Sequence, residues 1–350
     1  MESTDKSKPI LVTGASGYLA SWIVKQLLDD GYIVHGTVRN KGNAEKFKHL
    51  FDLSEKSSGN FKVFEADLLK KGSYEDAMKG CEIVIHTASP FIISNIKDPE
   101  KELLKPAKEG TINVLTQASK IESVKRIVLT SSIVAIMGDS IDAQNLDNQT
   151  VNESHWNTTS SANHQPYPYS KTIAEKEAWK MAEQQEQWKL VVINPGFIMG
   201  PSLFKNGSGT SIEMMKNMGD GKFKTGVTKL WFGMVDVRDV ARAHILAALN
   251  TGSSGRHIIV AENITFLNWA NILRKHFGDK YPFPKSEMPK FLIWLIGPLF
   301  GLTRKYVSKN VGYKSFYDNS YSKSDLGLTY RPIEETIIDH FQQLIDDGLV

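Results

Sequence analysis

The glycine-rich segment Thr13–Ala20 (TGASGYLA) constrains the fold of this chain more than any other feature. It ends a short apolar run, Ile10–Thr13, and opens a segment, Tyr18–Leu28, in which leucine and isoleucine recur at helical spacing. A helix that begins here presents free backbone N–H groups and the positive end of its dipole to a phosphate. We therefore expect a strand, a phosphate-binding turn and a helix. An ordinary strand-to-helix turn is the alternative.

Each small residue of this turn has a physical role. Gly14 permits the tight turn, Gly17 lets the backbone approach the phosphates, and Ala20 lets the helix pack close to the strand. The spacing is T-G-x-x-G-x-x-A and not the usual G-x-G-x-x-G. The turn residues expected to bind a dinucleotide are Gly14, Ser16, Gly17, Tyr18 and Leu19.

Strand and helix patterns alternate along the first 195 residues. The expected strands are Ile10–Thr13, Tyr32–Val38, Phe61–Phe64, Ile83–His86, Ile127–Thr130 and Leu190–Ile193. The expected helices are Tyr18–Leu28, Tyr74–Lys79, Leu103–Lys120 and Tyr169–Gln184, and in the C-terminal part Asp236–Leu249, Phe266–Phe277 and Glu334–Leu344. This alternation predicts an α/β protein with a Rossmann-type, doubly wound parallel sheet. We assign residues 1–195 to this domain and 196–350 mainly to a smaller substrate-binding lobe, with some segments, about 230–262, returning to the Rossmann domain.

Composition excludes several classes of protein. The single cysteine, Cys81, rules out a disulfide within the chain and makes a cysteine-ligated zinc site implausible, so no metal is expected. The 42 Lys and Arg residues against 39 Asp and Glu leave a net charge of +3, too small to indicate a nucleic-acid partner. The polar start, Met1–Lys6, does not resemble a secretory signal, and we expect a cytoplasmic protein.

The longest apolar run is Phe291–Leu302, which Gly297 and Pro298 interrupt. Its twelve residues are too few to span a bilayer, and membrane contact is not expected. Three interpretations stay open for this run: it caps a hydrophobic substrate, packs into the core, or touches a membrane surface.

The second expected strand ends in Arg39, and no Asp or Glu occurs from Tyr32 to Ala44 to accept a hydrogen bond from a ribose 2′-hydroxyl. An arginine here suits a 2′-phosphate, and Lys46 adds a second positive charge. Two such contacts of roughly 1.5–3 kcal/mol each give about 3–6 kcal/mol, or about 10²–10⁴-fold preference for NADPH over NADH. Solvated surface charges are the alternative. Asp67 and Leu68, after the third strand, stand where an adenine amino group would be met, although Asp67 equally fits a helix N-cap.

Tyr167 and Lys171 are four residues apart, which places both side chains on one helical face. Reduction of a carbonyl by hydride requires a proton for the nascent alkoxide, and an adjacent ammonium lowers the pKa of a tyrosine toward working conditions. Lys171 can also hold the nicotinamide ribose; Tyr169 lacks this spacing. Ser131 and Ser132 end the fifth strand, where a hydroxyl stabilises developing negative charge or simply caps the strand.

Taken together, these segments resemble the extended short-chain dehydrogenase/reductases over roughly residues 9–250. The closer likeness is to the branch of dihydroflavonol reductases, cinnamoyl-CoA reductases and NADPH methylglyoxal or aldehyde reductases. The resemblance is carried by TGASGYLASWIVKQLLDDGY, TVRN, ADLLKKGSYEDAMKGCEIVIHTASP, GTINVL, VLTSS, YPYSKTIAEKEAW, INPGFIMGP and DVRDVARAH.

The resemblance implies Ser132, Tyr167 and Lys171 as the catalytic set, with Arg39 and Lys46 on the 2′-phosphate. The further cofactor contacts that it implies are Asp67, Leu68, Thr87, Ala88, Ser89, Pro195, Gly196, Phe197, Ile198 and Ser211. It implies NADPH/NADP as cofactor, a small carbonyl substrate with an apolar or aromatic body, and a homodimer. A nucleotide-sugar epimerase or dehydratase, a 3β-hydroxysteroid-type dehydrogenase and a non-catalytic NADP-sensing regulator are the alternatives.

Overall fold

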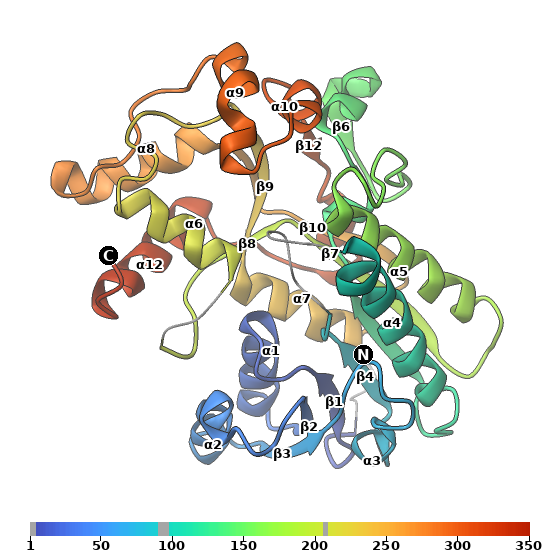
Figure 1. Ribbon diagram of the computed structural model, residues 1–350. Helices are drawn as coiled ribbons and strands as arrows, with labels where there is room; N and C mark the ends of the chain where they lie inside the picture. The colour runs from blue at the N-terminus through green and yellow to red at the C-terminus, as the bar shows by residue number, and fades with distance from the viewer. Residues whose placement is uncertain (1–4, 90–97, 206–208) are drawn as a thin grey trace.

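Short runs of consecutive apolar residues form the inner strands of a central sheet and are buried on both faces, as parallel strands between two helical layers must be, whereas the edge strand Asn60–Glu65 is partly exposed. The computed structural model describes residues 5–89, 98–205 and 209–350. The strands of this sheet are β1 (Ile10–Thr13), β2 (Ile33–Val38), β3 (Asn60–Glu65), β4 (Ile83–His86), β5 (Arg126–Thr130), β7 (Lys189–Pro195) and β10 (Gly255–Ile259). They lie in the order β10-β7-β5-β4-β1-β2-β3 and all run parallel (Figure 1). The predicted fold class is confirmed.

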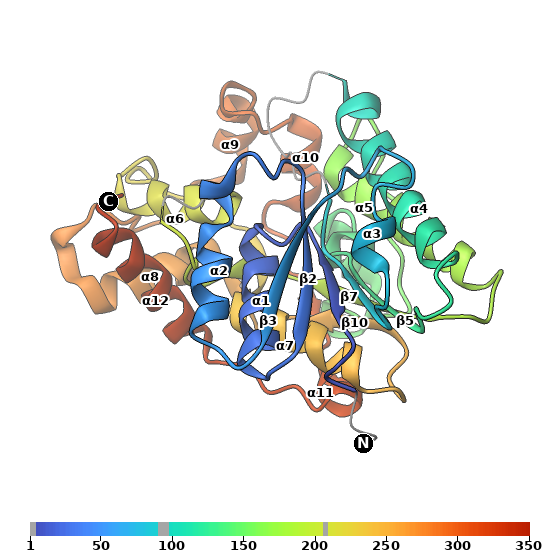
Figure 2. The same ribbon diagram turned by 90° about the horizontal axis from the view of Figure 1, so that it is seen from below.

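Helices cover both faces of this sheet, as Figure 2 shows. One face carries α1 (Tyr18–Asp29), α2 (Lys48–Glu55) and α7 (Val237–Leu249), and the other carries α3 (Glu75–Met78), α4 (Lys105–Ala118) and α5 (Pro166–Ala182). Successive residues of a strand point to opposite faces. Accordingly, Ile10 and Val12 belong to the first core layer, whereas Leu11 belongs to the second.

Most expected elements are present, with shifted ends. The helix expected from Tyr169 begins three residues earlier, at Pro166, which suits the first position of a helix. The helix expected from Leu103 is preceded by a π-helical turn, Glu100–Leu104. Asp236 caps α7 and does not belong to it, because its carboxylate accepts a hydrogen bond of 2.7 Å from the backbone N–H of Arg238.

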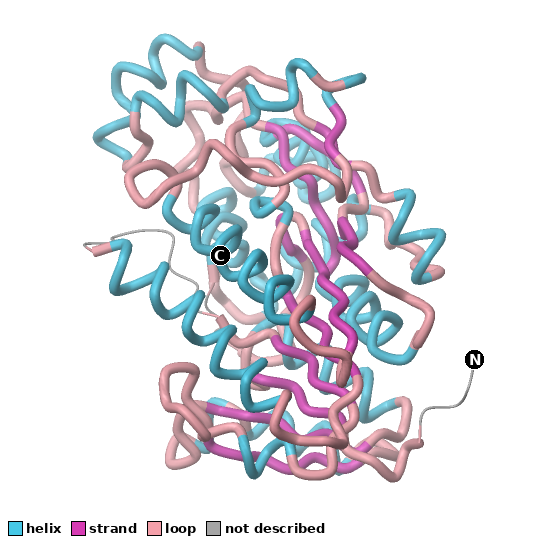
Figure 3. The backbone as a smooth tube through the Cα atoms, turned by 90° about the vertical axis from the view of Figure 1, so that its right-hand side faces the viewer, coloured by secondary structure: helices cyan, strands magenta, loops and turns pink. Residues whose placement is uncertain are grey.

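The C-terminal part builds a second lobe with a core of its own, which includes Met215, Trp269 and Phe341. Its sheet has the order β11 (Glu262–Thr265), β9 (Trp231–Asp236), β8 (Phe197–Met199), and its helices are α6 (Thr210–Gly219), α8 (Phe266–Phe277) and α12 (Ile333–Asp346). The remaining elements are β6 (Thr150–Val151), α9 (Lys290–Ile296), α10 (Arg304–Asn310), β12 (Phe316–Tyr317) and α11 (Ser320–Leu326). Strand β10 leaves this lobe and pairs with β7. Figure 3 shows strands running through the middle of the molecule with helices on either side.

The chain order of the strands creates a crevice beside β1. The first three strands run outward from β1 to β3, and the chain then returns to place β4 on the other side of β1. Ligands bind at such a switch point, outside the carboxyl ends of the strands. Thr13 joins the two strand ends there, because its Oγ1 accepts hydrogen bonds from the backbone N–H groups of Thr87 (3.1 Å) and Ala88 (3.0 Å). None of the helices within the described ranges has the length and hydropathy to cross a bilayer.

Candidate functional site

A cleft of about 1250 Å³ lies over the carboxyl ends of the central strands, between the sheet and the second lobe. Of the predicted site residues, all but one line it: Gly14, Ser16, Gly17, Tyr18, Leu19, Arg39, Lys46, Leu68, Thr87, Ala88, Ser89, Ser132, Tyr167, Lys171, Pro195, Gly196, Phe197, Ile198 and Ser211. The exception is Asp67, whose carboxylate accepts a hydrogen bond of 2.8 Å from the backbone N–H of Leu69. Asp67 therefore caps its own turn. It is not the helix N-cap that the sequence left open as an alternative, because the next helix begins only at Glu75.

The glycine-rich turn has the shape that a phosphate site needs. Gly14 has φ +66°, and a Cβ atom at this position would lie 3.2 Å from the Cβ of Ala88. Gly17 precedes α1 without a side-chain cap, and the first turn of this helix carries no acidic residue. The first N–H groups of α1 therefore remain available to an anion. The hydroxyl of Tyr18 donates a hydrogen bond of 2.6 Å to the carbonyl of Gly200, so Tyr18 also ties α1 to the second lobe.

Two cations mark one end of the cleft. Arg39 and Lys46 both line it and are exposed, and neither forms an ion pair with a carboxylate in the part of the chain that the structure describes. Beside them the wall contains Leu68 and the buried ring of Tyr74. This end of the cleft therefore combines an apolar wall with uncompensated positive charge.

The two serines after β5 have different surroundings. The hydroxyl of Ser131 is buried and donates a hydrogen bond to the carboxylate of Glu175. The Ser132 hydroxyl accepts a weak hydrogen bond from Val134 N–H at 3.3 Å and lies 3.5 Å from the carbonyl oxygen of Pro195. Since long hydrogen bonds are weak, Ser132 is the serine whose hydroxyl is more readily given to a ligand.

Tyr167 and Lys171 lie in the first turns of α5, on the wall of the cleft. Lys171 is 8% exposed, and its ammonium forms no hydrogen bond with any described residue. Burial lowers the pKa of Lys171 to about 8, against the attraction of Glu175. Burial also raises the pKa of Tyr167, so the expected lowering by the lysine does not prevail. The cause is the low dielectric of the site, which disfavours the phenolate.

A buried carboxylate that the sequence analysis missed fixes this helix in place. Glu175 is 1% exposed, and its carboxylate pairs with the guanidinium of Arg256 on β10 at 2.5 Å and accepts a hydrogen bond of 2.8 Å from Asn194 on β7. Glu175 follows Lys171 by four residues, so helical spacing alone places it on the same face. This spacing was the available signal.

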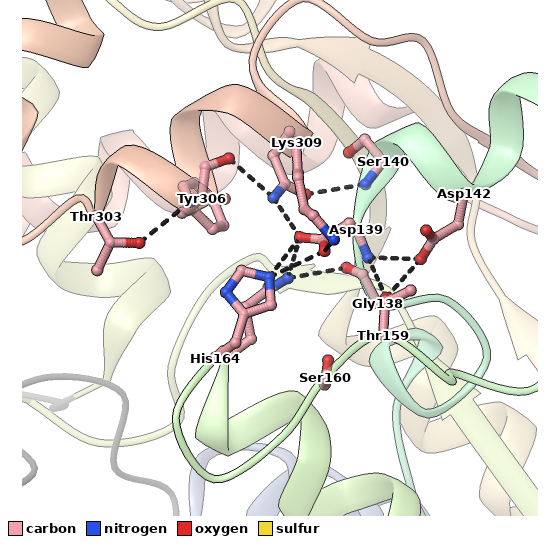
Figure 4. A network of polar contacts seen from close by, with 12 residues as sticks. Gly138, Asp139, Ser140, Asp142, Thr159, Ser160, His164, Thr303, Tyr306 and Lys309 are labelled. Atoms are coloured by element: carbon pink, nitrogen blue, oxygen red, sulfur yellow. Dashed lines mark hydrogen bonds and ion pairs between the residues drawn. The ribbon is translucent and has the colours of Figure 1, made fainter.

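A second missed network lies at the start of α5 (Figure 4). The fully buried carboxylate of Asp139 accepts hydrogen bonds from His164 Nε2 (2.9 Å), Gln165 Nε2 (2.7 Å) and Asn310 Nδ2 (2.7 Å), and Lys309 Nζ lies 3.4 Å away. Gln165 has a left-handed backbone, with φ +56°, directly before the helix that carries Tyr167. Asp139 thus connects the turn before α5, the helix that carries Tyr167, to α10 of the second lobe.

The other end of the cleft is largely apolar and aromatic. Its wall includes Ile133, Val134, Met137, Trp231, Phe232, Leu302, Tyr306 and Tyr317. Of the apolar run Phe291–Leu302, only Gly301 and Leu302 line the cleft, whereas Ile293 and Gly297 are buried. No group of three potential metal ligands occurs among the residues that the structure describes.

Comparison with known proteins identifies the family. Residues 10–261 match the NAD dependent epimerase/dehydratase family. The chain belongs to this family. Among its relatives, cinnamoyl-CoA reductase CAD2 from Medicago truncatula is 34% identical over 348 residues, which covers 98% of each chain. Tetraketide alpha-pyrone reductase 1 from Arabidopsis thaliana is 35% identical and covers 97% of this chain and 96% of its own.

Solved structures show the same similarity. Gre2 from Candida albicans, in complex with NADPH, is 29% identical, with a TM-score of 0.80 over 97% of this chain and 99% of its own. Yeast methylglyoxal/isovaleraldehyde reductase Gre2, complexed with NADPH, has the same identity and TM-score over 98% and 100%. These comparisons confirm the predicted resemblance to the extended short-chain reductases and the oxidoreductase class.

Proposed function

We propose that this protein is an NADPH-dependent carbonyl reductase that converts an aldehyde or ketone with an apolar or aromatic body into an alcohol. The observation that carries the proposal is that Ser132, Tyr167 and Lys171 line the same cleft as the glycine-rich turn. The reductase relatives and the NADPH in both Gre2 structures support it.

The cleft offers a partner for each polar part of NADPH, which supplies the hydride when bound. The open N-terminus of α1 suits the diphosphate, and Arg39 and Lys46 suit the 2′-phosphate. The buried ammonium of Lys171, which has no hydrogen-bond acceptor among the described residues, suits the ribose hydroxyls beside the nicotinamide. A buried ammonium without a partner is costly, so a hydroxyl-bearing ligand satisfies a need of this site.

The three catalytic side chains have separate tasks. Ser132 donates a hydrogen bond to the substrate oxygen as negative charge develops there. Tyr167 donates its hydroxyl proton to the same oxygen, and its raised pKa keeps that proton in place at neutral pH. The ammonium of Lys171 stabilises the phenolate that the transfer leaves behind.

The decisive experiment compares Tyr167→Phe with a matched control, Tyr169→Phe, on the same helix. Consumption of NADPH is followed against a panel of aldehydes and diketones, and NADPH affinity is measured by calorimetry. Tyr167→Phe should abolish turnover and leave NADPH affinity nearly unchanged, while the control keeps both. Activity that survives Tyr167→Phe would reject this tyrosine as the acid. An unmutated chain that binds NADPH yet reduces no compound of the panel would favour an epimerase, a dehydratase or a regulator.

Two further expectations remain predictions from the sequence. A homodimer would use α4 and α5, which pack against each other along one side of the sheet (Figure 1). Light scattering of the purified protein tests it. A cytoplasmic location requires imaging of the tagged protein in its own cell.

A further inference from the structure

The structure exposes an apolar surface outside the cleft. Of the seven large hydrophobic side chains that the described residues expose, five fall within ten positions of the chain. They are Phe291 (74% exposed), Trp294 (41%), Leu295 (58%), Leu299 (83%) and Phe300 (75%). We call these five side chains the apolar face. A gathered set of this kind on a water-soluble domain usually marks a contact site.

The apolar face is not an incomplete part of the core. On the inner side of α9, Ile293 is buried and packs with Val307 and Val311 in a small core of its own. The helix is therefore anchored by one side while the other side stays outside. Figure 1 shows α9 and α10 next to each other at the end of the molecule opposite β2 and β3.

The chain segment that carries the apolar face has charge of one sign. From Met288 to Tyr317 the chain contains no Asp or Glu. It contains five cations: Lys290, Arg304, Lys305, Lys309 and Lys314. The guanidinium of Arg304 lies 4.7 Å from the ring centroid of Trp294, directly at the edge of the apolar side chains. Lys309 is the exception in this set, because it faces the buried Asp139.

We propose that the apolar face docks onto an anionic lipid surface. Aromatic and aliphatic side chains in a segment whose charged residues are all cations, with Arg304 beside Trp294, fit the boundary between acyl chains and acidic headgroups. A second copy of this face is a poorer partner, because it would bring the same cations together. The seven-residue α9 enters the headgroup region without crossing the bilayer. Gly301, Leu302 and Thr303 follow the face and line the cleft, so docking places the rim of the cleft beside the lipid.

The expectation from sequence is that the chain makes no membrane contact. This proposal differs from that expectation, and it does not depend on the proposed reductase activity. Length and interruption excluded a transmembrane span but left open where the side chains of Phe291–Leu302 point. The structure places only part of the run inward.

The test is flotation of the purified full-length protein with vesicles of equal parts phosphatidylcholine and phosphatidylserine, and with vesicles of phosphatidylcholine alone. The protein should float with the first and much less with the second. The double variant Leu299→Ser, Phe300→Ser should lose binding. The double variant Arg304→Gln, Lys305→Gln should weaken it about 25-fold, at roughly five-fold for each cation near an anionic surface.

A matched control removes the same kinds of side chain elsewhere. Leu69 is 52% exposed and precedes the exposed Lys70 and Lys71. The single variant Leu69→Ser and the double variant Lys70→Gln, Lys71→Gln should each float like the unmutated protein. All variants should melt at the temperature of the unmutated protein, because the replaced side chains are exposed. The proposal is overturned if the unmutated protein does not float with the acidic vesicles, or if the controls lose as much binding as the variants. It is equally overturned if light scattering shows a dimer that Leu299→Ser dissociates while vesicles remain unbound.

Discussion

Replacing Asp139 by asparagine removes a buried negative charge and leaves the size of the side chain unchanged. The native carboxylate accepts hydrogen bonds from three donors, His164, Gln165 and Asn310, at 2.7–2.9 Å, with Lys309 at 3.4 Å. An asparagine has one acceptor oxygen, which can keep the bonds from Gln165 and Asn310. Its amide NH₂ group replaces Oδ2, the oxygen that His164 and Lys309 contact in the native protein. A donor then faces two other donors.

The size of the effect follows from these contacts. A hydrogen bond to a charged group contributes about 1.5–3 kcal/mol, and one between neutral groups about 1 kcal/mol. Two bonds that lose about 1 kcal/mol each and one that loses about 2 kcal/mol give about 4 kcal/mol, within the range for breaking a buried ion pair. At about 2.1 cal/mol/K per residue, the unfolding entropy of 350 residues is about 0.7 kcal/mol/K, so the Tm should fall by about 5 °C.

Calorimetry measures this shift in Tm. The matched control is Asp279→Asn, which should leave the Tm nearly unchanged, because the Asp279 side chain is 81% exposed and an exposed ion pair contributes little to stability. Asp139→Asn should also lower kcat more than it changes the KM for NADPH, because Asp139 holds the turn that precedes Tyr167. An Asp139→Asn protein that melts with the unmutated one and turns over at the same rate would refute the role of this network.

Two further predictions concern the charges of the cleft. Turnover should decrease as the pH rises through about 8, because Lys171 loses its proton there and the phenolate then forms without a neighbouring positive charge; a pH–rate profile that stays flat between pH 7 and about 9 contradicts this. Arg39→Asp should raise the KM for NADPH by about 10²-fold or more and spare NADH, which steady-state kinetics with both cofactors measures. Equal use of the two cofactors by the unmutated chain would already contradict the argument.

Local features of the chain made the dinucleotide half of the cleft predictable. Buried parallel strands require continuous apolar runs, and the turn after β1 requires Gly14 at a positive φ. Because all strands of the sheet run in one direction, residues that follow each strand come together at one edge. Arg39, expected from the end of the second strand, and Thr87 and Ser132, which the family resemblance implied, all line the cleft wall.

The buried networks were not predictable in this way, because their partners lie far apart in the chain. Glu175 pairs with Arg256, and Asp139 with Asn310, and neither spacing leaves a local pattern. Asp67 shows the opposite problem: its local surroundings fitted an adenine contact nearly as well as a helix N-cap, and the structure shows a turn that its carboxylate caps, with no helix behind it. The run Phe291–Leu302 has the composition of a core segment, and a seven-residue helix is too short for its periodicity to show which side faces outward.

The pKa values of Tyr167 and Lys171 change how the pair works. The sequence predicted that the lysine prepares the tyrosine by lowering its pKa, yet burial disfavours the charged form of each group. In the proposed mechanism the attraction between the two groups therefore acts once the proton has left, when phenolate and ammonium coexist in a medium of low dielectric. In the proposed mechanism Glu175 acts through Lys171, because its attraction raises the pKa that burial lowers. Glu175→Gln should shift the alkaline limb of the pH–rate profile to lower pH without changing the affinity for NADPH. A limb that stays in place would show that Glu175 serves only to hold α5 against the sheet.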